Sequence, residues 1–164
     1  MKLKLGVEPI CVRSGASYTK KTSVDGDYPF GGELAGHVYF RDRFIGTDDG
    51  IYAGLRFVEI LSRSQNKASE LLNGIEEYHS TPEERISVKE EEKDYIINGA
   101  IEYCNSKGYD IFTIDGVKVL YDDGFALIRK SNTGPNLTTR YEAKTIEKLN
   151  ERKEEFNTLI NKLK

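Results

Sequence analysis

Residues 117–129 read Val-Lys-Val-Leu-Tyr-Asp-Asp-Gly-Phe-Ala-Leu-Ile-Arg. Two runs of strand-forming residues, 117–121 and 125–129, flank Asp122-Asp123-Gly124, and such a short Asp/Gly segment is typical of a tight β-hairpin. Asp115-Gly116 separates the first run from a further strand-like run at residues 111–114 in the same way. The sequence therefore predicts an antiparallel meander over residues 111–129.

Further elements flank the meander on both sides. Residues 137–143 predict another strand, and Thr145 can cap a final helix. The apolar stripe of that helix comprises Ile146, Leu149, Phe156, Ile160 and Leu163. Upstream, residues 85–89 alternate with period two, and a helix follows whose apolar face carries Ile97, Ala100, Ile101 and Cys104. We expect an α+β domain, an antiparallel sheet with helices on one face.

The first half of the chain combines predicted strands with predicted helices. Residues 8–13 indicate a short strand before a turn at Ser14-Gly15, and a polar stretch follows. The glycines of residues 29–37 are expected in a loop beside a strand at residues 37–40. Asp48 and Asp49 can cap a helix, and residues 67–75 predict a short second one. The apolar positions of the capped helix are Ile51, Leu55, Val58 and Leu61.

A proline-bearing polar connection, Tyr78-His79-Ser80-Thr81-Pro82, is the best candidate for a domain boundary. It divides the chain into residues 1–77 and residues 78–164. We expect the two parts to belong to different domains.

Composition limits the classes of function. The 164 residues carry 24 basic and 27 acidic side chains, a net charge of −3 and a pI near 5.5, which argues against nucleic-acid binding. Cys11 and Cys104 are far apart and form no zinc-binding pattern. Residues 1–6 lead into no apolar stretch of signal-peptide type, and no run is long enough to span a membrane. These features predict a cytoplasmic protein with no membrane partner.

One segment collects groups that bind phosphate. Arg129 offers a planar guanidinium, Ser131 and Thr133 offer hydroxyls, and Asn132 offers an amide, while Gly134 lets the backbone come close. Over residues 129–144, four basic residues against one acidic residue give a local net charge of +3 in a chain that is negative overall. A polar turn between two strands has the same composition, so the pattern alone leaves both interpretations open.

A second segment, residues 31–37, places Glu33 and His37 among glycines. A carboxylate accepts hydrogen bonds from sugar hydroxyls, which makes the segment a candidate sugar-binding loop. A glycine-rich turn with a structural histidine is the alternative.

Taken together and in this order, the two segments resemble motifs of the α-D-phosphohexomutase family, in particular its bacterial phosphomannomutase/phosphoglucomutase branch. Residues 32–37 (Gly-Glu-Leu-Ala-Gly-His) resemble that family's sugar-binding loop G-E-M-S-G-H, and Phe44-x-x-x-Asp48-Asp49-Gly50 resembles the helix start that follows it. Residues 129–135 (Arg-Lys-Ser-Asn-Thr-Gly-Pro) resemble its phosphate-binding loop R-x-S-N-T-x-P. Residues 140–143 (Arg-Tyr-Glu-Ala) resemble the R-F-E-A strand after that loop.

The resemblance runs from about Gly6 to the C-terminus. It implies the latter part of the family's third domain, an α/β unit with a mixed sheet and helices, followed by its fourth, TATA-binding-protein-like α+β domain. It implies phosphohexomutase activity, an isomerase reaction in carbohydrate metabolism, for the complete enzyme. The implied phosphate-binding residues are Arg129, Ser131, Asn132, Thr133 and Arg140, and the implied sugar-binding residues are Glu33 and His37. The implied ligand is a hexose phosphate, a mannose or glucose 1- or 6-phosphate.

The family's phosphorylated serine, in a T-A-S-H-type loop, and its magnesium loop, D-G-D-x-D-R, have no counterpart in this sequence. Asp25-Gly26-Asp27 lacks the third aspartate and the arginine of the magnesium loop. We therefore assign no catalytic residue, no metal ligand and no bound cofactor to this chain, while Mg²⁺ is expected in the complete enzyme. The chain alone is expected to be inactive. Expected partners are the missing N-terminal domains, or a second copy joined through an exposed sheet edge.

Two positions depart from the family motifs. Ala35 stands where the sugar loop usually has serine, and Ala16 stands where a related T-G-H-S segment has histidine. Each lost hydrogen bond costs about 1–3 kcal/mol, so sugar recognition is weakened more than phosphate binding. Two alternatives stay open: a non-catalytic phosphosugar-binding or interaction module that retains only the phosphate loop, and a purely structural domain.

Overall fold

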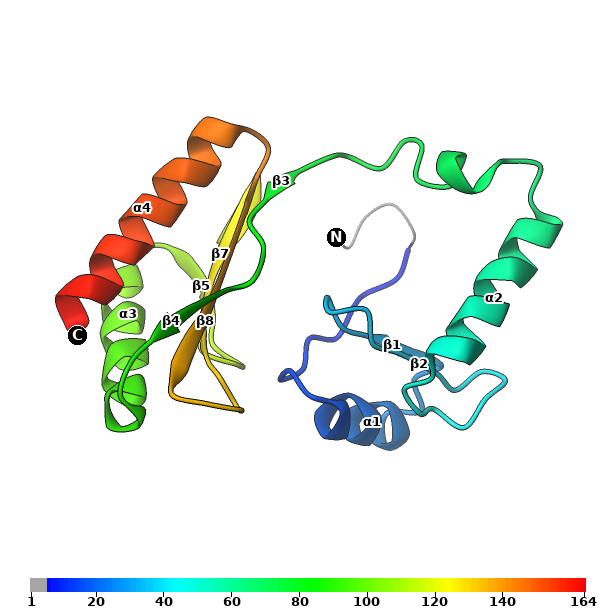
Figure 1. Ribbon diagram of the computed structural model, residues 1–164, viewed down its shortest axis with the longest axis horizontal. Helices are drawn as coiled ribbons and strands as arrows, with labels where there is room; N and C mark the ends of the chain where they lie inside the picture. The colour runs from blue at the N-terminus through cyan, green and yellow to red at the C-terminus, as the bar shows by residue number, and fades with distance from the viewer. Residues whose placement is uncertain (1–5) are drawn as a thin grey trace. The chain divides into compact units, whose positions relative to one another are not determined.

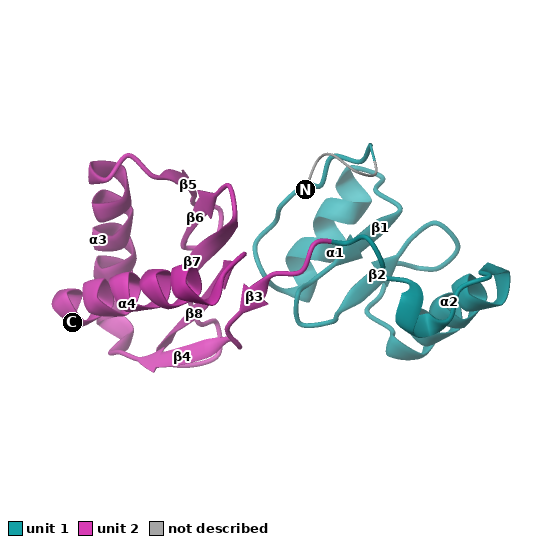
Figure 2. Ribbon diagram, turned by 90° about the horizontal axis from the view of Figure 1, so that it is seen from above, with its two compact units in different colours: residues 1–75 teal, residues 76–164 magenta. Residues whose placement is uncertain are grey.

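The computed structural model describes residues 6–164, and the charged start of the chain at residues 1–5 lies outside this range. The backbone forms two compact units, one ending at Ile75 and the other spanning Glu76–Lys164. Figure 2 draws them in teal and magenta. We call them unit 1 and unit 2 and describe each by itself.

Unit 2 is built on a six-stranded antiparallel sheet with the strand order β3-β8-β7-β6-β5, in which β4 also pairs with β8. The strands are β3 (His79–Ser80), β4 (Glu84–Ser87), β5 (Asp110–Phe112), β6 (Val117–Tyr121), β7 (Gly124–Lys130) and β8 (Asn136–Ala143). The predicted meander is confirmed. Gly116 and Gly124 adopt positive φ angles of 81° and 144°, and a Cβ at either would lie within 2.2 Å of a carbonyl oxygen of the neighbouring strand.

Helices α3 (Lys93–Ser106) and α4 (Ile146–Leu163) cover one face of this sheet, as predicted, and a short 3-10 turn, η2 (Glu90–Glu92), precedes α3 (Figure 1). Alternate strand residues face the helices and form a continuous core. The core strand residues are Val117, Val119, Ala126, Ile128, Leu137, Tyr141 and Ala143. Phe156 and Ile160 of α4 are 1% and 0% exposed, so α4 packs on the sheet through these positions, whereas Ile146 at the start of the predicted stripe is 48% exposed.

Strand pairing decides what lies on the other face of the sheet. Arg129 pairs with Thr138, and Leu127 pairs with Arg140. Because side chains alternate along a strand, Arg129 and Arg140 project from the same face, the one opposite the helices. The sheet therefore carries two arginines on its helix-free face beside the β7–β8 connection.

Unit 1 contains α1 (Ala16–Asp25), the antiparallel pair β1 (Phe30–Gly32) and β2 (Val38–Phe40), α2 (Gly50–Arg63) and a 3-10 turn η1 (Ala68–Glu70). The α2 prediction is confirmed, since the Asp49 carboxylate accepts a hydrogen bond from the Tyr52 amide at 2.9 Å. The Tyr52 ring stacks on Phe44, with ring centroids 4.0 Å apart. In the described residues the sheet of this unit is this antiparallel pair.

Several local predictions in unit 1 were wrong. Residues 8–13 do not form a strand, because none of the described strands pairs with them. The polar residues after Gly15 form α1, and its buried positions, Thr19 and Ser23, carry hydroxyls that give no apolar period. Gly31 and Gly32 belong to β1 instead of a loop. Within residues 67–75, where a helical stretch was expected, the structure has only the 3-10 turn η1.

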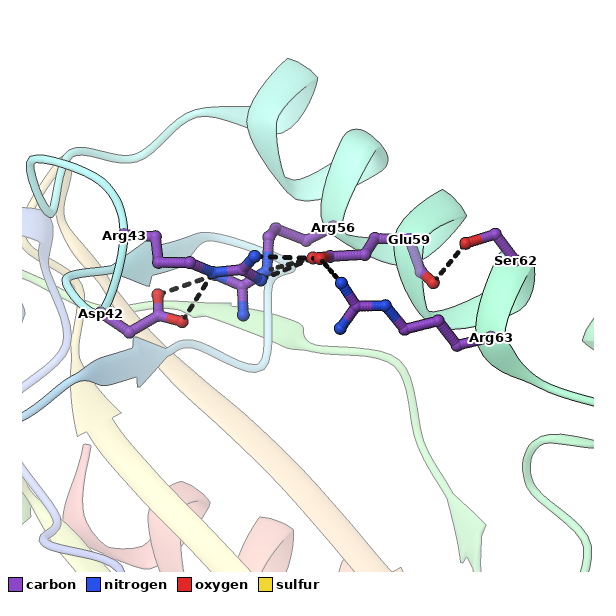
Figure 3. Close-up of polar contacts among 6 residues, drawn as sticks. All are labelled: Asp42, Arg43, Arg56, Glu59, Ser62 and Arg63. Carbon is purple, nitrogen blue, oxygen red and sulfur yellow. Dashed lines mark hydrogen bonds and ion pairs between the residues drawn. The ribbon is translucent and has the colours of Figure 1, made fainter.

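A network of charged side chains ties α2 to the loop after β2 (Figure 3). Arg56 donates to Asp42 at 2.7 Å, and Arg43 donates to Glu59 at 2.9 and 2.5 Å. Arg63 reaches the same Glu59 carboxylate at 2.7 Å. Hydrogen bonds from these arginines lower the pKa of the Asp42 and Glu59 carboxyl groups, so both stay ionised at neutral pH.

No helix within residues 6–164 has both the length and the apolar character needed to cross a membrane.

Candidate functional site

The candidate sugar loop is the turn that joins β1 to β2. The amide of Glu33 donates to the carbonyl of His37 at 2.9 Å, and the amide of Gly36 donates back to the carbonyl of Glu33 at 3.0 Å. Gly36 has a φ angle of 92°, which an L-residue with a side chain rarely adopts. The turn therefore holds Glu33 and His37 opposite each other, one on each side of the hairpin connection.

The Glu33 carboxylate is anchored from within unit 1. Its Oε1 accepts a hydrogen bond from the Tyr39 hydroxyl at 3.1 Å and one from the Thr19 hydroxyl at 3.5 Å. Burial and the adjacent Glu33 carboxylate raise the pKa of Tyr39 to about 12, so its hydroxyl stays protonated and donates. Both contacts use Oε1, and a carboxylate can accept several hydrogen bonds, so capacity remains for ligand hydroxyls.

His37 is oriented by a second carboxylate. Its Nδ1 lies 2.6 Å from Oδ2 of Asp48, and the two side chains are 52% and 38% exposed. Asp48 is held in place because it forms a β-bridge with Tyr39 and directly precedes the capping residue of α2. A hydrogen bond at Nδ1 fixes the ring orientation and leaves Nε2 available for a ligand.

The candidate phosphate loop connects β7 to β8. The Ser131 amide donates to the Asn136 carbonyl at 2.9 Å, which closes the hairpin. Inside the loop, the Thr133 amide donates to the Ser131 hydroxyl oxygen at 3.3 Å, and the two hydroxyl oxygens lie 3.4 Å apart. Asn132 and Thr133, at the tip, are exposed. The loop therefore gathers two hydroxyls and an amide side chain on an accessible turn.

The two arginines of the sheet face have weak partners. Arg129 Nη2 lies 3.5 Å from Glu83 Oε1, and its side chain is 16% exposed. Arg140 Nη2 donates to the Ser80 hydroxyl at 3.4 Å, while its buried Nε has no hydrogen-bond partner among the described residues. Contacts near 3.5 Å are at the limit of hydrogen bonding, so both guanidinium groups retain donors for an anion.

The sequence-predicted residues therefore fall into two groups. Glu33 and His37 share one turn of unit 1, whereas the five implied phosphate-binding residues share the β7–β8 hairpin of unit 2. Sequence reasoning missed the supports: Tyr39 and Asp48 in unit 1, and Lys93 in unit 2, whose ammonium contacts the phosphate loop at the carbonyls of Ser131 and Gly134. The Lys93 contacts join residues distant in sequence, and the shorter-range contacts of Tyr39 and Asp48 follow no recognisable local pattern.

The described residues do not fit a metal ion. Within residues 6–164, no three His, Cys, Asp or Glu side chains gather closely enough to hold one. Asp25 forms an ion pair with Lys21 at 2.5 Å, and Asp27 forms one with Arg41 at 3.5 Å. Cationic side chains thus engage both carboxylates of the Asp-Gly-Asp segment.

Comparisons with known proteins place this geometry in a family. The sequence profile described as "Phosphoglucomutase/phosphomannomutase, alpha/beta/alpha domain III" matches residues 2–78, and the one described as "Phosphoglucomutase/phosphomannomutase, C-terminal domain" matches residues 83–159. A phosphoglucomutase of Neisseria meningitidis is 38% identical over 157 residues, which are 94% of this chain and 34% of that protein. A phosphomannomutase/phosphoglucomutase of Pseudomonas aeruginosa is 38% identical over 155 residues, with the same coverage of each chain.

A solved structure agrees with the sequence comparisons. The crystal structure of a phosphoglucomutase/phosphomannomutase family protein from Burkholderia thailandensis matches with a TM-score of 0.82 and 35% identity, covering 95% of this chain and 33% of that one. The chain spans about a third of the length of the curated relatives it matches. It therefore belongs to the phosphoglucomutase/phosphomannomutase family, and its two matched segments correspond to domain III and the C-terminal domain of that family.

Proposed function

We propose that this chain is the substrate-binding C-terminal part of a phosphohexomutase. Unit 2 grips the phosphate that is not being transferred while the complete enzyme interconverts hexose 1- and 6-phosphates. The phosphate-binding residues are Arg129, Ser131, Asn132, Thr133 and Arg140, and Glu33 and His37 of unit 1 bind sugar hydroxyls.

One observation carries the proposal: two arginines project from one face of the sheet, beside an exposed loop with two hydroxyls. A guanidinium binds phosphate through a planar pair of donors and does not distinguish which sugar carbon bears the phosphate. This suits a mutase, because its bisphosphate intermediate must bind in two orientations. Such a loop is expected to bind the phosphate electrostatically and to position the substrate.

Chemistry at the transferred phosphate belongs to other parts of the enzyme. The resemblance assigns phosphoryl transfer to a phosphoserine and magnesium to a separate loop, so no step of this proposal uses a metal or a nucleophile of this chain. Rotation of unit 2 about the connection near residues 78–82 would close the complete enzyme on its substrate.

The test is a backbone amide NMR titration of the 164-residue chain with glucose 1-phosphate and mannose 1-phosphate. Three or four charge-assisted contacts, less the cost of association, predict a Kd of roughly 1 mM. Saturable shifts are expected at residues 131–134 and near Glu33.

Arg129→Ala is expected to abolish the loop shifts. Lys130→Ala is the matched control, because Lys130 is adjacent but binds Asp94 at 2.6 Å. Equal loop shifts in the parent chain and Arg129→Ala, or none at several times the expected Kd, would contradict the proposal. Shifts confined to residues 131–134 would favour a module that retains only the phosphate loop.

A further inference from the structure

A buried lysine contacts the backbone of the phosphate loop. Lys93 is the first residue of α3, and 4% of it is exposed. Its ammonium donates to the Ser131 carbonyl at 3.1 Å, to the Gly134 carbonyl at 2.6 Å and to Oε1 of Glu90 at 2.9 Å. An ammonium has three donors and no acceptor, so these partners match its full donor capacity.

Local rules disfavour a lysine at this position. A cation at a helix N-terminus opposes the helix dipole, and a buried ammonium costs free energy unless it is paired. Glu90 supplies the paired charge but is itself 70% exposed along its side chain. The remaining two partners of Lys93 are both carbonyls of one loop. Contact with that loop is therefore the feature that accounts for a lysine here.

These contacts fix the direction of two peptide groups. In a trans peptide the carbonyl and the following amide N–H point in opposite directions, and the described chain has no cis peptide bond. Because the Ser131 carbonyl faces Lys93, the Asn132 amide N–H faces away from it. The Gly134 carbonyl also faces Lys93, and the next residue, Pro135, has no N–H. Two partial negative charges are thus turned toward the lysine.

We propose that Lys93 is a positioning residue that arranges the phosphate loop before an anion binds, an inference that rests on the proposed function. It holds the loop at Ser131 and Gly134 and keeps their carbonyls directed at its ammonium. The Asn132 amide N–H then points away from α3, and Arg129 and Arg140 also project from the face opposite the helices. Arranging donors in advance lowers the cost of ordering them upon binding.

The test compares Lys93→Met with Lys130→Met in the 164-residue chain. Methionine keeps an unbranched apolar side chain but removes the ammonium. Lys130 is the matched control, because the same charge is lost next to the same loop, while its contact is the Asp94 side chain. By NMR titration with glucose 1-phosphate, Lys93→Met is expected to weaken binding about tenfold, and Lys130→Met less than about threefold. Folded Lys93→Met binding within threefold of the parent chain would overturn the proposal.

A second readout separates this inference from the proposed function. Without ligand, amide exchange at Ser131 reports whether the hairpin bond to the Asn136 carbonyl stays closed. Lys93→Met is expected to accelerate this exchange, whereas Lys130→Met leaves it unchanged; equal exchange in the two variants would overturn the positioning role. If the parent chain bound no sugar phosphate, the proposed function would fail while this measurement still decided the role of Lys93.

A third measurement uses only the parent chain and therefore tests the inference even if Lys93→Met does not fold. In the parent chain, ¹⁵N NMR of lysine side chains is expected to show slowly exchanging Lys93 ammonium protons that shift when inorganic phosphate is added. Rapid exchange, as expected for half-exposed Lys130, would contradict the contacts on which the inference depends.

Discussion

Helices α2 and α4 have similar sequence patterns but different surroundings. Both carry an apolar stripe and a side-chain cap at the first turn. In unit 2, α4 buries Leu149, Phe156 and Ile160 against the sheet. In unit 1, no residue of α2 is buried, and Ile51 and Leu55 are 82% and 63% exposed. An apolar stripe therefore predicts a helix, but it does not predict whether another element packs against that stripe.

Ion pairs and aromatic contacts hold α2 in unit 1. The charged network of Asp42, Arg43, Arg56 and Glu59 joins the helix to the loop after β2, and Arg56 lies 4.5 Å above the Phe40 ring. Exposed ion pairs of this kind contribute little to stability. Within residues 6–75, Tyr39 is the single fully buried apolar residue, whereas unit 2 has a continuous core. We infer that unit 2 carries most of the stability of this chain.

The largest expected effect tests this contrast directly. Phe156→Ala, at a position 1% exposed, removes a ring from the core of unit 2 and is expected to lower the free energy of unfolding by about 3–5 kcal/mol. Leu55→Ala, at a position 63% exposed on α2, is expected to change it by less than about 0.5 kcal/mol. Urea denaturation followed by NMR signals of each unit measures both values.

The contrast between α2 and α4 would be contradicted if Leu55→Ala were as destabilising as Phe156→Ala. The apolar stripe of α2 would then be covered in solution. Repeating the denaturation at two protein concentrations distinguishes self-association, which depends on concentration, from contacts within one chain. A sheet edge is the other expected surface for self-association, and Leu55→Ala would not affect it.

The sequence predicts unit 2 well because its signals are local. Asp115-Gly116 and Asp122-Asp123-Gly124 mark the hairpins, and strand alternation then fixes which face meets the helices. The same alternation places Arg129 and Arg140 on one face once the hairpin register is known. Lys93 could not be found this way, because its contact with Ser131 joins residues far apart in sequence.

Unit 1 is predicted less well, for two physical reasons. Helix α1 buries hydroxyls in place of apolar side chains: the Ser23 hydroxyl donates to the Thr19 carbonyl at 2.8 Å, and Thr19 reaches Glu33. Such a helix has no hydrophobic period to detect. Residues 8–13 have a strand-like composition, but a strand requires a pairing partner, and none of the described strands supplies one.

The helix caps provide a smaller test of the same contrast. Asp49→Ala removes a carboxylate that accepts from the Tyr52 amide at 2.9 Å and is expected to destabilise α2 by about 1 kcal/mol. Thr145→Ala removes a longer bond of 3.3 Å to the Lys148 amide, and about 0.5 kcal/mol is expected. Amide exchange at Tyr52 and Lys148 measures the two changes. A larger effect at Lys148 would show that packing of α4 makes its cap more important than that of α2.

A core tyrosine gives a similarly small effect at neutral pH. Tyr141 is 0% exposed and donates to Oδ1 of Asn157 at 3.3 Å, so Tyr141→Phe is expected to cost about 0.5 kcal/mol at pH 7. Burial raises the pKa of Tyr141 from 10.0 to about 12, because the folded core disfavours the phenolate. The folded state then binds more protons than the unfolded state between these pH values, and stability falls as pH rises.

Phenylalanine cannot ionise, so the stability of the Tyr141→Phe variant does not fall with pH for this reason. Its deficit at pH 7 is expected to close above pH 10 and to reverse by about pH 12, as measured by denaturation of unit 2. Tyr39→Phe is the matched control, because burial also raises the pKa of Tyr39 to about 12, but in unit 1. A deficit that stayed constant with pH would place the Tyr141 hydroxyl in contact with water. An equal effect of Tyr39→Phe on unit 2 would show that the two units unfold together, and the contrast between them would not extend to stability.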